Sequence, residues 1–271
     1  MAPPEVNHAL DEQSTSGIMM GLAAGLGFLC MVVVAARLYT RAILLHMTGL
    51  DDIMIVVTQE VLTLCKLEGH FGVGKHSWVS DKENLTRQLQ SLFAAIQLYI
   101  WALACVKVSL LLQYRRIFLV TWLHRVVIVI IGFAVAWNIA QSILVSFACV
   151  PMSTLHPSMA DTCLDSLTIW YLAAGINITT DFIVFLLPIP LINSLQLPAR
   201  QKFLLCLVFG LGLFTCVISI VRVTTLHYVI ATNDPSWFST QGATWSMVEV
   251  NCAILCSCLP TIRYLLAQMF P

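Results

Sequence analysis

Charged side chains are scarce in this sequence. Only 10% of the 271 residues are charged, whereas 59% are hydrophobic, and the mean hydropathy is +0.86. A soluble globular domain carries about a quarter charged residues and about half apolar ones. The shortage of charge therefore excludes an ordinary soluble domain. It predicts an integral membrane protein whose first partner is the lipid bilayer, in a plasma or endoplasmic reticulum membrane that the sequence does not distinguish.

The few charges balance and form no basic run. Fourteen Lys and Arg residues stand against fourteen Asp and Glu residues, and no cluster is long enough to follow a phosphate backbone. Nucleic-acid binding is therefore excluded. A cleaved signal peptide is not expected either, because residues 1–16 contain three acids and no basic residue.

Three further features are missing. We find no internal repeat that would favour a transporter built from two halves. The last predicted helix, residues 244–267, contains no lysine, which excludes a retinal Schiff base there, and no other cofactor is predicted. His70 and His76 lack a third ligand at a recognisable spacing, so no metal site is expected.

Long apolar runs are abundant, and they predict an all-α fold of seven transmembrane helices, since an open sheet cannot satisfy its backbone in lipid. Windows of about 20 apolar residues place the spans at residues 17–37, 50–67, 88–114, 122–147, 167–190, 203–230 and 244–267. We therefore expect one membrane domain over residues 17–267, preceded by a short external segment of residues 1–16.

The basic residues between spans predict the orientation. One side of the membrane receives Arg37, Arg41, Arg115, Arg116, Arg125, Arg200, Lys202 and Arg263 with almost no acid. The positive-inside rule then predicts an external N-terminus and a cytoplasmic C-terminus.

Two of the ten cysteines lie outside the spans. Cys149 and Cys163 fall in the external loop after the fourth span, where an oxidising compartment favours a disulfide over two free thiols. Asn84 begins a glycosylation sequon close to the third span, and its occupancy is left open.

Polar side chains within the spans can be sorted by depth, because a helix rises about 1.5 Å per residue. The cytoplasmic level contains Asp51, Asp52 and Lys107, the midplane level Glu60, Gln97, Asn177 and Asp181, and the outer level Arg222 and Glu249. Lys107 is a candidate to pair with the two aspartates, and Arg222 with Glu249.

Asn177 and Asp181 are four residues apart, which places them on one helix face. A charged residue at a span's centre costs roughly 2.5–3.5 kcal/mol and normally faces the bundle interior at a functional site. The pair therefore predicts one wall of an internal polar cavity. Trp101 lies one turn from Gln97 and is a further lining candidate, with core packing as the alternative.

The buried acids outnumber the buried bases. Lys107 and Arg222 cannot neutralise all five carboxyl groups of Asp51, Asp52, Glu60, Asp181 and Glu249. Burial favours the neutral form of a carboxyl group without a cation, and such an acid can protonate a substrate. The alternative is that these groups are neutral hydrogen-bonding struts between helices.

Several segments carry a family resemblance. They are "GLDDIM", "GVGKH", "KVSLLLQYRRIF", "NITTDFIVFLLPIPLINSLQLPARQK", "FGLGLFTCVISIVR" and "VEVNCAILCSCLPTIR". From about Arg37 to Arg263 the sequence resembles the fungal seven-helix rhodopsin-domain family, which includes receptor-like proteins and proteins encoded in secondary-metabolite gene clusters. The resemblance implies a seven-helix bundle with the depth-sorted charges at typical positions, and it implies no settled chemistry. The receptor-like members tend to carry an external cysteine-rich domain or a long tail, neither of which we expect here.

Three functions fit these observations. The first is an acid–base cyclase or isomerase of a terpenoid or polyketide pathway, with Asp181 or Glu60 as the proton donor and Asn177 orienting it. Arg222 and Glu249 would then be a structural or anion-holding pair. The second is a receptor that binds a lipophilic ligand in the same cavity and signals through its cytoplasmic loops, the one function that requires a signalling partner. The third is proton-coupled transport through the same acids.

Overall fold

The chain folds into a bundle of helices. The computed structural model describes residues 16–44, 46, 48–68, 82–117, 120–148, 164, 166–189, 210–225 and 235–269. The helices are α1 (Ser16–Tyr39, continued by the π-helical turn η2, Thr40–Leu44), α2 (Leu50–Glu68), α3 (Lys82–Ile117), α4 (Thr121–Ser146), α6 (Ser166–Leu186), the Gly210–Thr225 helix and α9 (Pro235–Met269). The all-α prediction is confirmed.

Five of the described helices are long and apolar enough to cross a bilayer. These five segments are Gly21–Leu44, Gln90–Arg116, Thr121–Ser146, Leu167–Leu186 and Gln241–Thr261. An integral membrane protein is therefore confirmed. The other two helices are α2, which carries five charged residues, and the shorter Gly210–Thr225 helix. The count of seven spans and the orientation stay predictions.

Two helices begin earlier than the predicted spans. α3 starts at Lys82 and α9 at Pro235, whereas the apolar windows begin at residues 88 and 244. Hydropathy detects only the stretch that matches the hydrocarbon thickness. Backbone hydrogen bonding can continue a helix beyond that stretch, so the window underestimates its length.

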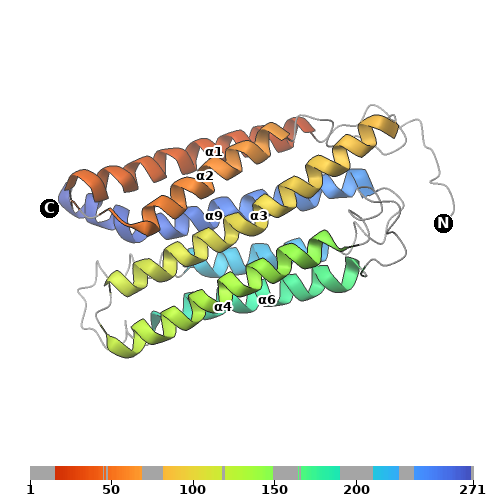
Figure 1. Ribbon diagram of the computed structural model, residues 1–271. Coiled ribbons are helices and arrows are strands. Elements are labelled where there is room, and N and C mark those ends of the chain that lie inside the picture. The colour runs from red at the N-terminus through yellow and green to blue at the C-terminus, as the bar shows by residue number, and fades with distance from the viewer. Residues whose placement is uncertain are drawn as a thin grey trace.

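The first and last helices lie side by side and close the bundle (Figure 1). α2 packs on α3, α1 on α9, and α3 also packs on α4 and α9, while α4 packs on α6. The ends of α3 and α9 and the start of α4 lie at one end of the bundle, here called the C-terminal end, and the start of α1 lies at the other (Figure 1).

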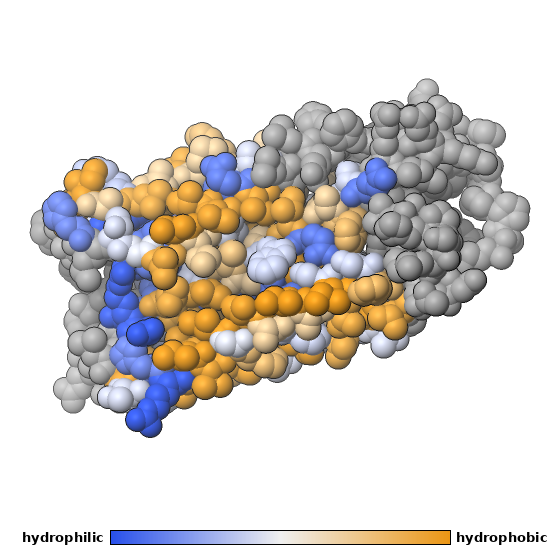
Figure 2. Space-filling model, viewed as in Figure 1, coloured by the Kyte–Doolittle hydropathy of each residue, from blue (hydrophilic) through white to orange (hydrophobic). Residues whose placement is uncertain are grey.

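The surface of the bundle is largely apolar on the face seen in Figure 2, with hydrophilic residues gathered toward the C-terminal end. Large side chains such as Phe28 of α1 and Val129 of α4 are exposed on it. The buried core lies mainly among α1, α2, α3 and α9, where Leu111 and Ile254 are fully enclosed. Exposed apolar side chains around a packed interior are the arrangement that a lipid environment favours.

A buried cluster of charges joins α1 to α2 at the C-terminal end. Arg37, which is 0% exposed, places Nη2 at 3.1 Å from Asp51 Oδ2 and Nε at 2.9 Å from Asp52 Oδ1. Arg41 pairs with the same two aspartates, and Arg116 Nη1 of α3 lies 3.7 Å from Asp51 Oδ1. The cluster therefore ties together three helices.

Gly49 fits closely into this cluster. A Cβ atom at this position would overlap Arg116 Nη2 and the carboxylate of Asp51. The backbone N–H of Gly49 donates to Asp52 Oδ2 at 3.2 Å, and the Gly49 carbonyl accepts from the Asp52 backbone N–H at 3.0 Å. This reciprocal pair caps the start of α2.

Candidate functional site

Asn177 and Asp181 of α6 lie one turn apart and face α3. Asp181 is only 8% exposed, and its Oδ1 lies 3.0 Å from Nζ of Lys107. The expected pairing of Lys107 with Asp51 and Asp52 is therefore wrong, because Arg37 and Arg41 occupy those aspartates. Lys107 is instead the cation of Asp181.

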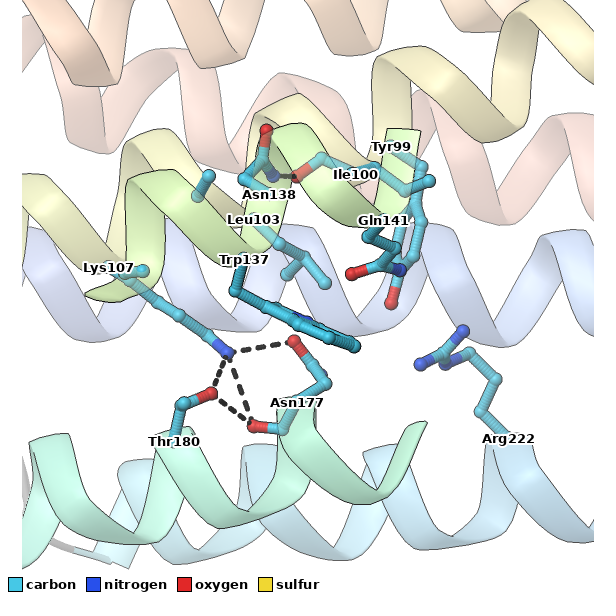
Figure 3. A pocket seen from close by; sticks show the side chains of 12 residues that line it. Tyr99, Ile100, Leu103, Lys107, Trp137, Asn138, Gln141, Asn177, Thr180 and Arg222 are labelled. Atoms are coloured by element: carbon cyan, nitrogen blue, oxygen red, sulfur yellow. Dashed lines mark hydrogen bonds between the residues drawn. The ribbon is translucent and has the colours of Figure 1, made fainter. Parts of the chain in front are cut away.

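The ammonium of Lys107 is surrounded by acceptors from α6. It donates to the Asn177 carbonyl at 3.2 Å, to Asn177 Oδ1 at 2.7 Å and to Thr180 Oγ1 at 2.7 Å (Figure 3). Thr180 Oγ1 in turn donates to the Asn177 carbonyl at 2.8 Å. Each proton of the ammonium can find a partner, which a buried charge requires.

Asn177 connects this pair to a second acid. Its Nδ2 donates to Asp181 Oδ2 at 3.3 Å and to Glu249 Oε1 of α9 at 3.2 Å. Because Oδ1 accepts from Lys107, both the oxygen and the nitrogen of the Asn177 amide are hydrogen bonded. The sequence suggested Asn177 as a partner of Asp181, and the structure adds that it bridges two carboxylates.

Glu249 lies in a second ion pair and is 1% exposed. Its Oε2 lies 3.0 Å from Nε of Arg222 on the Gly210–Thr225 helix, as charge contact and not as an aligned hydrogen bond. Tyr99 of α3 donates its hydroxyl to Oε2 at 2.6 Å, and Ser219 donates to Oε1. The Arg222 guanidinium also sits over the Tyr99 ring, 5.0 Å from its centroid, a cation–π arrangement.

These contacts form one network across α3, α6, the Gly210–Thr225 helix and α9. It contains two bases, Lys107 and Arg222, and two acids, Asp181 and Glu249, so its formal charges cancel. Asp181 is therefore not one of the buried acids left without a cation, which its predicted role as a proton donor required. The sequence count of buried acids failed because it left out the buried Arg37 and Arg41, which pair with Asp51 and Asp52, and because Glu60 is exposed.

A small cavity adjoins the network. It has a volume of about 40 Å³, and its walls come from α3, α4, α6 and the Gly210–Thr225 helix. The lining residues are Tyr99, Ile100, Leu103, Ala104, Lys107, Ala134, Trp137, Asn138, Gln141, Asn177, Thr180 and Arg222. The cavity thus exposes both cations of the network, whereas Asp181 and Glu249 line a smaller neighbouring space of about 10 Å³.

Three predicted residues do not reach this cavity. Glu60 lies on the exposed face of α2, and Trp101 is 45% exposed on α3. Gln97 donates to the carbonyl of Ser142 on α4 at 3.1 Å, which places it in the α3–α4 contact. Depth alone did not indicate which direction each side chain faces.

Several uncharged residues of the network and cavity were not predicted. Tyr99, Ser219, Thr180 and Trp137 are uncharged, and such side chains are common in spans that have no site. The available signal for Thr180 was its position three residues after Asn177, on the same helix face. Nothing in the sequence separated Trp137 from an aromatic residue at the membrane interface.

The structure bears only in part on the predicted absence of a metal site, on the loop cysteines and on the glycosylation sequon. Within the described part of the chain, no three His, Cys, Asp or Glu residues gather as a metal site. Cys149 and Cys163 lie outside the described residues, and the side chain of Asn84 is not described either. The flanking residues Ala148 and Leu164 pair as an isolated bridge.

Residues 36–268 match the profile of the fungal rhodopsin domain, which is most of the chain. This chain belongs to the fungal rhodopsin domain family. No solved structure matches it. The expected family resemblance is therefore confirmed.

Relatives of this fungal rhodopsin domain protein carry different descriptions. Satratoxin biosynthesis SC1 cluster protein 4 of Stachybotrys chartarum is 31% identical over 173 residues, covering 60% of each chain. A SAT4 family membrane protein of Emericella nidulans is 28% identical, covering 79% of this chain and 58% of the relative. Receptor GIN3 of Arthrobotrys oligospora is 25% identical, covering 72% and 47%. The chain thus spans between 47% and 60% of the length of these curated relatives.

Proposed function

We propose that this protein binds a small lipophilic molecule in the cavity beside Lys107 and rearranges it by acid–base chemistry, as a cyclase or isomerase of a secondary-metabolite pathway. One observation carries the proposal. Lys107 and Arg222 both line the cavity, and each is held from behind by a buried carboxylate. Ionisable groups in a membrane interior are expensive and normally serve a function.

The geometry favours Lys107 as the proton donor in place of Asp181 or Glu60. Its ammonium faces the cavity, while Asp181 lies behind it at 3.0 Å. After Lys107 gives a proton to the substrate, the neutral amine next to the Asp181 carboxylate takes a proton back from the rearranged molecule. The cycle consumes no external acid or base, as an isomerisation or cyclisation requires.

The remaining groups position the reactants. Asn177 holds the Lys107 ammonium and links it to Glu249, and Arg222 lies at the other side of the cavity (Figure 3). Apolar walls from Ile100 and Leu103 would shield a reactive intermediate from water. The biosynthetic description of the Stachybotrys relative supports a pathway role.

The alternative is a receptor that binds a lipophilic ligand at the same cavity. The receptor description of the Arthrobotrys relative favours it, as does the network itself, because it joins helices that a ligand could shift relative to one another. The two functions differ in one respect: an enzyme consumes the molecule, and a receptor does not.

A metabolite comparison tests the proposal. A host that carries the surrounding pathway is compared with the same host bearing Asp181→Asn, after both proteins are shown to reach the membrane in equal amounts. Without the Asp181 carboxylate, Lys107 should no longer cycle as the general acid and base. Because such catalysis contributes at least roughly a hundredfold, we expect the product to fall by that factor or more and the precursor to accumulate.

Glu60→Gln is the matched control. It makes the same acid-to-amide change on the exposed face of α2, so its metabolite profile should equal that of the wild type. Equal profiles for Asp181→Asn and the wild type would reject the enzyme and leave the receptor function to be tested by ligand binding.

A further inference from the structure

Two hydrogen-bond donors in the cavity wall have no aligned acceptor in the part of the chain that the structure describes. Among the described residues, none accepts from the buried indole Nε1 of Trp137. Arg222 Nε lies 3.0 Å from Glu249 Oε2 but makes no aligned hydrogen bond with it, and in Figure 3 the guanidinium points toward the cavity. A buried donor without a partner costs about 1–3 kcal/mol, so these donors indicate a missing acceptor.

The charge balance of the site restricts what that acceptor can be. The two ion pairs already cancel. A bound anion would therefore add an uncompensated negative charge in the membrane interior, and a bound cation would lie against Lys107 and Arg222. A neutral group with an acceptor oxygen satisfies the donors and preserves the balance.

The cavity size restricts how much of the molecule enters. Its volume is about 40 Å³, and one water-sized group needs about 10–15 Å³ of such volume. Only a small polar head fits beside Trp137 and Arg222. Ala104 of α3 and Ala134 of α4, two small residues that also line the cavity, leave space for the carbon chain next to that head.

Asn138 also lines the cavity and has an acceptor unpartnered within the described residues, but that acceptor does not point toward Trp137. Its Nδ2 donates to the Ile100 carbonyl at 2.9 Å, and its unpartnered Oδ1 is turned away from Trp137 in Figure 3. The donors of Trp137 and Arg222 therefore define the head-group end of the cavity.

We propose that this cavity binds the carbonyl oxygen of a neutral lipophilic ketone, ester or lactone, which accepts hydrogen bonds from Trp137 Nε1 and from Arg222. This rests on the proposed function, because it assigns the substrate class of the same site. It also explains how an acid–base step is assisted, since donors on a carbonyl oxygen stabilise the charge that develops there.

Photoaffinity labelling tests this assignment on the full chain in lipid nanodiscs. The probe is a medium-chain methyl ketone with a diazirine at the far end of its chain, and labelled peptides are identified by mass spectrometry. The competitors are the unlabelled ketone, the alkane of the same length and the corresponding fatty acid. We expect labelling next to the cavity on α3, α4 or α6, with the ketone competing roughly tenfold better than either alternative.

Trp137→Phe keeps an aromatic side chain, although a smaller one, and removes the N–H. We expect this variant to reduce the preference for the ketone by roughly three- to tenfold, whereas Trp101→Phe, the same change at an exposed position on α3, should not alter it. Equal competition by the alkane, better competition by the fatty acid, or an unchanged preference in Trp137→Phe would overturn the proposal.

The outcomes separate this inference from the proposed function. If product formation depends on Asp181 but the cavity has no preference for the ketone, the carbonyl assignment fails and the enzyme stands. If the preference is present and the metabolite profiles are equal, the cavity binds carbonyl compounds without converting them. If no cavity peptide is labelled, the binding proposal fails as well.

Discussion

Lys107 of α3 and Asp181 of α6 form an ion pair in the interior of the bundle, with Nζ 3.0 Å from Oδ1. The two residues are far apart in the sequence and lie on helices that the structure brings together. Asn177 then extends the pair to Glu249 and Arg222. The polar interior of the protein is therefore one connected unit, and a change at either end should be felt at the other.

Removing one partner of this pair should destabilise the fold more than removing both. Lys107→Met leaves the Asp181 carboxylate buried without its cation, and we expect the free energy of unfolding to fall by about 3–5 kcal/mol. The double variant Lys107→Met/Asp181→Leu replaces the pair by apolar groups and should recover most of that loss while forming no product. Thermal unfolding in mild detergent measures both, and a double variant no more stable than the single one would contradict the expectation.

Arg37 should not tolerate replacement by lysine. Its guanidinium reaches Asp51, Asp52 and the Ser257 carbonyl together, whereas an ammonium is a point charge that cannot match this fork. We expect Arg37→Lys to lower the free energy of unfolding by roughly 2 kcal/mol. Arg125→Lys, at an exposed position of α4, is the control and should unfold like the wild type.

Gly49→Ala should disturb the charge cluster at the C-terminal end of the bundle. The added Cβ would overlap Asp51 and Arg116, so α2 or the cluster must shift. We expect a lower unfolding temperature and a smaller yield in the membrane. Gly132→Ala is the matched control, because a Cβ there meets nothing within 4 Å. Equal stabilities of the two variants would argue against the close fit at Gly49.

Glu60→Leu should raise membrane yield without affecting function. Glu60 lies on the exposed face of α2. If α2 crosses the membrane, as the sequence predicts, a carboxyl group there opposes insertion. We expect more inserted protein in a glycosylation-based insertion assay and unchanged product. Loss of product with normal insertion would instead give Glu60 a role that its position does not suggest.

Cys149 and Cys163 should form a disulfide. The adjoining residues Ala148 and Leu164 pair as a bridge, with the Leu164 N–H donating to the Phe147 carbonyl at 3.1 Å, so the two ends of this connection are held together. Non-reducing peptide mass spectrometry should recover a linked peptide pair that separates on reduction. Free-thiol labelling of both cysteines in protein taken directly from membranes would contradict it.

The sequence was informative about features that depend only on position along the chain, such as where a helix lies and how deep a residue sits in it. Long apolar runs located the helices because a span must match the hydrocarbon thickness. Counting residues along each helix placed Arg222 and Glu249 at one depth, and the structure places them in contact. The same counting misplaced Lys107, since a depth carries no information on which neighbouring helix lies in front of a side chain.

The sequence also did not show in which direction around the helix axis each side chain points. Gln59 and Glu60 are consecutive, yet Gln59 is buried and Glu60 is exposed, because neighbouring positions on a helix point about 100° apart. In a soluble helix the apolar stripe reveals that direction. In α4 and α6, apolar residues lie on all sides, so the sequence does not distinguish the buried face of the helix from the face toward lipid.

The amino-acid sequence by itself determined that the protein is helical, lies in a membrane and keeps a small set of ionisable residues inside its spans. Each of these follows from the energy of placing a residue in hydrocarbon, a property of single residues and short runs. Only the tertiary structure decided that Lys107 neutralises Asp181, that Asn177 joins the two ion pairs, and that Trp137 and Arg222 face one cavity. Those are relations between helices, and they depend on packing that brings distant segments within hydrogen-bonding distance.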